Sequence, residues 1–145
     1  MASAYTTQAQ ILGNIQMPDL ISLTDDSNTG NLDNGVLNQV IANASGVVDM
    51  YSANIYGSQL PFNPVPLAVA NIALVIACYM LYERREVPME KNKFGPRYVA
   101  AVKFLEGVNV GKFHFDDTTN RDYSQVAATG RATIYGAGNV LANSM

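Results

Sequence analysis

The sequence predicts an all-α protein: a small bundle of about three long helices, short N-terminal helices and an extended C-terminal arm. Residues 36–55 and 94–108 carry apolar side chains every three or four positions, as one face of an amphipathic helix does. Between these stretches, residues 67–82 are apolar on almost every side, which suits a central helix. We therefore expect a helical domain at residues 1–111 and an arm at residues 112–145, in which short strands could form.

The composition indicates one domain that shares part of its surface with other chains. A length of 145 residues suits a single core, and a charged fraction of 14% is low for the surface of a small monomer. The net charge of −3 gives no electrostatic basis for tight, direct binding of nucleic acid. The first ten residues show no secretion signal, so we expect assembly in a reducing cytoplasm.

Two short helices are expected before the bundle. Thr7 and Gln10 match a capping box in front of Ile11, and Gly13 is a suitable end for that helix. Pro18 is tolerated at the first position of a second helical turn. The apolar residues of both turns need a partner surface, so we expect the turns to pack on the main body.

The polar loop at residues 25–35 partly resembles a calcium-binding loop of the EF-hand type. With Gly30 at the sharp turn, Asp25 takes the first position and Val36 the twelfth, where a bidentate Glu would be needed. We therefore expect a turn with Asp33 capping the next helix and no metal site. A small non-catalytic metal- or peptide-binding module is the alternative function for the chain.

The apolar stretch is expected to form a helix at residues 64–86, after a linker that contains several prolines. A membrane-spanning helix is the competing interpretation, but such a helix needs about 20 apolar residues, and Asn71 interrupts this run. We expect a buried core helix with an inert thiol at Cys78. The expected core positions are Leu67, Ile72, Val75, Ile76 and Tyr79.

Most of the basic residues lie near the start of the last predicted helix. They are Arg84, Arg85, Lys91, Lys93, Arg97 and Lys103. A solvated helical face is one interpretation. The functional alternative is a docking patch for an acidic surface on a partner, and for this patch we single out Lys91, Lys93 and Arg97.

The C-terminal arm has few apolar residues and no helical period, so it cannot build a core of its own. Aromatic and aliphatic residues recur along it at wide intervals, as they do in a segment that becomes ordered on a neighbouring chain. The expected assembly contacts of the arm are Phe113, Phe115, Tyr123, Ile134 and Tyr135.

The sequence shows no catalytic machinery. Nucleophilic catalysis usually needs a histidine beside the nucleophile, and His114 is the only histidine. Asp116 and Asp117 follow it closely, but the spaced second cluster of a metal site is missing. No phosphate-binding or dinucleotide-binding glycine motif is present. We therefore expect a protein that is not an enzyme and uses no cofactor.

The order of several segments resembles the head-to-tail connector family of Mu-like tailed bacteriophages. The segments are YTTQAQI, LISLTDD, VLNQVIANASGVVDMYSANIY, ERREVP and YVAAVKFLEGVNVGKFHF. The resemblance covers residues 5–115, and it depends on the order of the segments because no single one is diagnostic.

The resemblance implies a structural virion protein at the neck of the particle. It implies a ring of about twelve copies, closed by contacts between two different faces of each subunit. The partners that it implies are the portal protein and a tail-completion or tail-tube protein, with DNA passing through the ring without specific binding and with no membrane involved. In such connectors a C-terminal extension reaches the portal or a neighbouring subunit, which would give the arm a function.

Overall fold

The computed structural model describes residues 4–115, and the predicted all-α fold is confirmed for this part of the chain, which contains no strand. The helices are α1 (Gln8–Leu12), α2 (Met17–Thr24), α3 (Asn34–Tyr56), α4 (Leu67–Glu83) and α5 (Gly95–Asn109), with short 3₁₀ turns η1 (Gly57–Gln59) and η2 (Met89–Lys91). Residues 4–113 belong to one compact unit. The predicted strands of the arm lie outside the described residues, apart from its first four positions.

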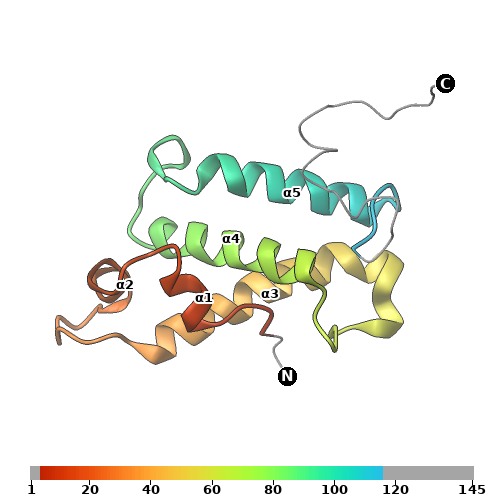
Figure 1. The fold of residues 1–145 in the computed structure, drawn as a ribbon. Helices are drawn as coiled ribbons and strands as arrows, with labels where there is room; N and C mark the ends of the chain where they lie inside the picture. The colour runs from red at the N-terminus through yellow and green to blue at the C-terminus, as the bar shows by residue number, and fades with distance from the viewer. Residues whose placement is uncertain (1–3, 116–145) are drawn as a thin grey trace. The chain divides into compact units, whose positions relative to one another are not determined.

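Helices α3, α4 and α5 form the body of this unit, and each of them contacts the other two (Figure 1). Helix α1 packs on α4, and α2 packs on both α3 and α4. Tyr79 of α4 stacks on Tyr98 of α5, with ring centroids 4.0 Å apart and ring planes 8° from parallel. The short N-terminal helices therefore cover the part of α4 that the two long helices leave open.

The core is centred on α4, as the sequence predicts. Ile72, Ile76 and Tyr79 are buried, which confirms them as core residues. Cys78 is also buried, and this burial raises the pKa of its thiol from 9.0 to about 12. Among residues 4–115, no helix has the length and apolar character needed to cross a membrane.

Two of the predicted core positions are wrong: Leu67 is 77% exposed and Val75 is only half-buried. The helix begins three residues later than predicted because Pro66 has an extended backbone, with φ −61° and ψ 147°. Leu67 is thus the first residue of α4, beyond the part that its neighbours cover. The helix also ends earlier, at Glu83, and Glu86 has a left-handed backbone with φ 60°, which no α-helix can include.

Both predicted N-terminal caps are confirmed. Thr7 and Gln10 form a complete capping box, and the Asp33 side chain accepts a hydrogen bond of 3.1 Å from the backbone N–H of Val36. The expected face of α3 is largely buried, including Leu37, Val40, Ile41, Ala44 and Val48. The caps set where α1 and α3 begin. The apolar residues of α3 determine which side of this helix is buried.

Tyr5 joins the N-terminal segment to two distant parts of the fold. Its hydroxyl donates to Asp49 of α3 over 2.5 Å and accepts a hydrogen bond of 3.0 Å from the backbone N–H of Phe62 in the proline linker. Its own N–H donates to the Ser45 side chain over 2.9 Å. One side chain therefore ties the N-terminus, α3 and the linker together.

Phe113 packs against Gly107 near the end of α5. Helix α5 continues to Asn109, and Gly107 is buried inside it. The Phe113 ring lies where a side chain at position 107 would be, and it stacks on Phe104 with centroids 5.0 Å apart. Gly111, with φ 81°, supplies the left-handed turn that brings Phe113 back to α5.

Replacing Gly107 with Ala should lower the free energy of unfolding. Ala is favoured over Gly inside a helix by about 1 kcal/mol, but overpacking a filled site costs about 1–3 kcal/mol, so the packing term should win. Gly46→Ala is the matched control because Gly46 is an exposed position of α3 with no atom near the added methyl group. Urea denaturation should show destabilisation for the first variant and stabilisation for the second; stabilisation by both would contradict the packing of Phe113.

Candidate assembly surface

Lys93 and Arg97 lie close together at the start of α5, and Lys91 ends the 3₁₀ turn η2, two residues before Lys93. Lys93 Nζ is 5.5 Å from the ring centroids of both Tyr82 and Phe94, and Arg97 Cζ is 5.4 Å from the Phe94 centroid. The two rings are 5.9 Å apart. We call Lys91, Lys93, Arg97, Tyr82 and Phe94 the basic-aromatic patch. Its three cations are exposed, and Phe94 is buried.

Asn92 holds the loop that carries the patch. It is only 3% exposed, and its side chain donates to the carbonyl of Tyr79 over 3.2 Å and accepts from the N–H of Phe94 over 3.0 Å. At Gly95 a Cβ atom would come 2.5 Å from the carbonyl oxygen of Met89, so only glycine allows the loop to approach the helix this closely. The backbone positions of Lys91 and Lys93 are therefore set by buried polar contacts.

Arg84 and Arg85 do not belong to this patch, although the sequence places them near it. Both guanidinium groups bind Asp26 in the loop after α2, over 2.7 and 3.0 Å. They also donate to the backbone carbonyls of Leu23 and Ser22, over 2.6 and 2.9 Å. We call this contact the Asp26 joint: it ties the loop between α2 and α3 to the end of α4.

The hydrogen bonds and positive charge of the two arginines lower the pKa of the Asp26 carboxyl group. The hydrogen bond from Arg84 holds the pKa of Asp26 below its ordinary value of 3.8. A carboxyl group whose pKa is lowered by folding stabilises the fold at pH values above its ordinary pKa. That contribution is lost as the pH falls through the lowered pKa.

Lys103 is also separate from the patch. It lies on α5 six residues after Arg97, which places the two side chains about 120° apart around a helix of 3.6 residues per turn. Of the six basic residues that the sequence grouped together, Lys93 and Arg97 share the Phe94 ring, and Lys91 lies two residues before Lys93 in the chain.

The loop at residues 25–35 is held by its own backbone and not arranged around an open site. The Asp25 carboxylate accepts from the N–H of Thr29 over 2.9 Å and from the N–H of Gly30 over 2.7 Å. These bonds, with that of Thr29 the strongest influence, lower the pKa of Asp25 below 3.8. Among residues 4–115, no three His, Cys, Asp or Glu side chains are grouped so that they could hold a metal ion.

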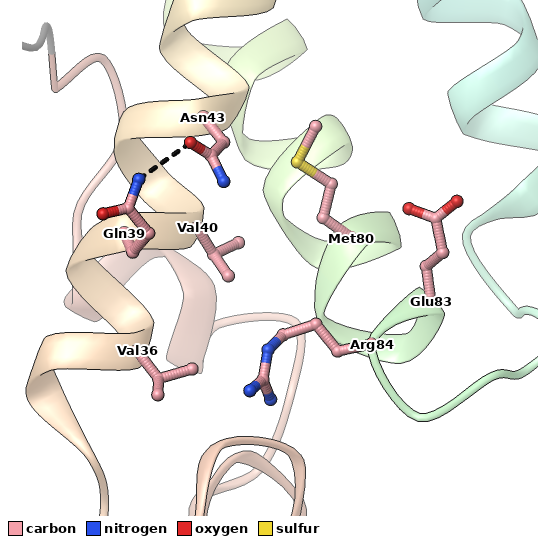
Figure 2. Close-up of a pocket in the computed structure, with 7 residues that line it drawn as sticks. All are labelled: Val36, Gln39, Val40, Asn43, Met80, Glu83 and Arg84. Atoms are coloured by element: carbon pink, nitrogen blue, oxygen red, sulfur yellow. Dashed lines mark hydrogen bonds between the residues drawn. The ribbon is translucent and has the colours of Figure 1, made fainter.

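An open pocket of about 460 Å³ lies between α3 and α4, and the sequence did not reveal it (Figure 2). It is lined by Val36, Gln39, Val40 and Asn43 of α3 and by Met80, Glu83 and Arg84 of α4. Gln39 donates to Asn43 across one side over 2.9 Å, and Arg84 is already bound in the Asp26 joint. These seven residues include no nucleophile paired with a base.

The remaining predicted contact residues divide into two groups. Phe113 is half-buried against Phe104, so much of its ring already serves the helical unit. Phe115 follows the end of that unit. Tyr123, Ile134 and Tyr135 lie outside the described residues, and their assembly role stays a prediction.

A comparison with protein-family models decides the family of the chain. The model described as "Bacteriophage Mu, Gp36" matches residues 5–133, which is most of the sequence. The chain belongs to the bacteriophage Mu Gp36 family. It is accordingly a phage structural or morphogenesis protein. No curated protein matches the chain.

The sequence segments that resemble those of Mu-like connectors contact one another in this Gp36-family fold. YTTQAQI contributes Tyr5, which binds Asp49 of α3. LISLTDD contributes Asp26, which binds the two arginines of ERREVP. The order of these segments along the chain thus reflects contacts between elements far apart in the sequence.

Removing the charge of Asp26 should destabilise this Gp36-family chain at pH values where Asp26 of the unchanged protein is ionised. We expect Asp26→Asn to lower the urea midpoint at pH 7, because two guanidinium groups lose their shared partner. The difference from the unchanged protein should shrink as the pH falls below 3.8 and through the lowered pKa of Asp26. The Asp26 carboxyl then becomes neutral in the unchanged protein, as the Asn amide of the variant is at every pH.

Glu106→Gln is the control for this variant, because Glu106 is an exposed carboxylate of α5 outside the Asp26 joint. Its effect at pH 7 should be smaller than that of Asp26→Asn. A pH-independent difference for Asp26→Asn would show that the joint does not act through charge.

Proposed function

We propose that the chain is a structural subunit of the phage neck, where several copies form a ring adaptor that joins the portal at the capsid vertex to the tail. The observation that carries the proposal is the family match over residues 5–133, which makes the chain a phage structural or morphogenesis protein. The proposed partners are further copies of the chain, the portal protein and a tail-completion or tail-tube protein. The proposed location is the virion neck.

The chemistry of the helical unit supports a structural role over an enzymatic one. The chain has a single histidine, and the pocket between α3 and α4 lacks a paired nucleophile and base among its lining residues. Asp26, Arg84 and Arg85 are used to join helices to one another. The polar groups thus mainly fix the shape of the subunit, which is what a rigid adaptor needs.

The charge balance supports passage of DNA through the proposed ring. A protein grips DNA by replacing counterions with several lysine and arginine side chains. The net charge of this chain is −3, and two of its arginines are neutralised in part by Asp26. A ring of such subunits would let the phosphate backbone pass without holding it.

Loss of the chain should leave complete heads and complete tails that do not join. The test places an early stop codon in the reading frame of the phage that encodes the chain, and examines lysates by electron microscopy. DNA-filled heads and free tails are the expected products, and purified chain added to the lysate should restore joined particles. Normal virions without the chain, or heads that never fill, would each overturn the proposed position in assembly.

The state of the purified protein gives an independent check. Light scattering after size exclusion should show a monomer near 15.6 kDa that assembles into a ring on particles carrying the portal or on tails. A chain that joins neither particle would favour the alternative of a small binding module.

A further inference from the structure

We propose that the basic-aromatic patch is the docking site for a carboxylate-rich surface of a different protein of the neck, and not for DNA. The inference rests on the proposed function, because it names the surface by which the adaptor binds a partner. It depends on the charge, position and environment of Lys91, Lys93 and Arg97.

No ion pair in the described part of the chain includes a cation of the patch. The two ion pairs found in residues 4–115 both use Asp26, and neither includes Lys91, Lys93 or Arg97. All three side chains are exposed. The patch is therefore free to bind negative charge from outside this unit.

The patch also lies where local physics disfavours cations. The N-terminal end of a helix carries partial positive charge, so a cation there is disfavoured and an anion is favoured. Helix α5 has no acidic residue in its first turn and no side-chain cap, yet Arg97 occupies that turn. An approaching carboxylate would relieve this repulsion among like charges.

The aromatic rings hold the cations in place without cancelling their charge. Lys93 lies over both Tyr82 and Phe94, and Arg97 lies over Phe94. Immobilising a free Lys or Arg side chain on binding costs conformational entropy, and for Lys93 and Arg97 part of that cost is already met in the unbound chain. The hydrogen bonds of Asn92 fix the loop that carries Lys91 and Lys93. The patch therefore needs little rearrangement to bind a partner.

The arrangement fits carboxylates of a protein better than the phosphates of DNA. Lys93 and Arg97 over two adjacent rings form a compact spot, whereas a duplex presents a long row of phosphates and its affinity depends on how many are neutralised. The net charge of −3 opposes approach of DNA at long range. Arginine beside aromatic rings is typical of protein–protein interfaces, and its planar guanidinium can bind a carboxylate through two parallel hydrogen bonds.

The test compares two charge reversals on the same helix. Arg97→Glu changes the patch, and Lys103→Glu makes the same change of charge on a different face of α5. Each purified variant is mixed with DNA-filled heads and with free tails from the phage that lacks the chain, at low and high salt, and binding is measured by co-sedimentation. Circular dichroism checks that both variants melt like the unchanged protein.

We expect Arg97→Glu to bind the particle that the unchanged protein binds, head or tail, at least about ten-fold more weakly at low salt. Lys103→Glu should bind that particle within about two-fold of the unchanged protein. Raising the salt should narrow the difference, because exposed charges are then screened. Lys93→Gln is the second variant; it removes one charge without adding an opposite one, and should weaken binding less. Equal binding by all variants would overturn the patch while the proposed function stands; failure of the unchanged protein to bind either particle would overturn both.

A carbodiimide crosslink identifies the chemistry of the partner. The reagent joins a lysine amine directly to a carboxylate, so Lys91 or Lys93 should be linked to Asp or Glu peptides of another virion protein, read by mass spectrometry. A duplex DNA added as competitor should not displace the chain. Links only to a second copy of this chain, or displacement by the duplex, would overturn the proposed occupant.

Discussion

The structure depends on the burial of α4, a helix with apolar side chains on almost every side. Each large apolar side chain removed from water stabilises a fold by about 1.5–3 kcal/mol, so a helix of this kind must be covered from several directions. Val69, Ile76 and Leu81 are completely buried. Helices α3 and α5 cover two sides, and the short α1 and α2 are needed for a third. This accounts for the presence of two helices that are too short to be stable alone.

Polar contacts then fix how the covering elements are aligned. Tyr5 ties the N-terminal segment to α3 and the linker, the Asp26 joint ties the loop after α2 to the end of α4, and Asn92 ties the loop before α5 to α4. Apolar packing tolerates small shifts of one helix against another, whereas a hydrogen bond loses its strength with a small change of distance or angle. The three contacts therefore make one alignment preferable to its neighbours. A subunit of a larger assembly needs such a defined shape.

Local features could be predicted from the sequence, and contacts between distant segments could not. The period of apolar residues predicted the three long helices. Thr7 marked the start of the short α1 and Asp33 the start of the long α3, because a cap involves only residues three apart. The exposure of Leu67 was missed because it depends on the starting residue of α4. The partner of Arg84 lies 58 residues away, so its separation from the patch could be seen only in the fold. The pocket between α3 and α4 was missed for the same reason, since it exists only where two helices approach.

The composition of the basic-aromatic patch determines which solution conditions can alter it. Its cations are two lysines and one arginine, and none of its five residues is a histidine. Histidine is the residue type on which pH-operated protein switches are usually built. The patch therefore lacks the usual component of such a switch. Dissolved salt is the condition that acts on it directly, because the electrostatic reach of exposed charges shrinks to about 8 Å at physiological ionic strength.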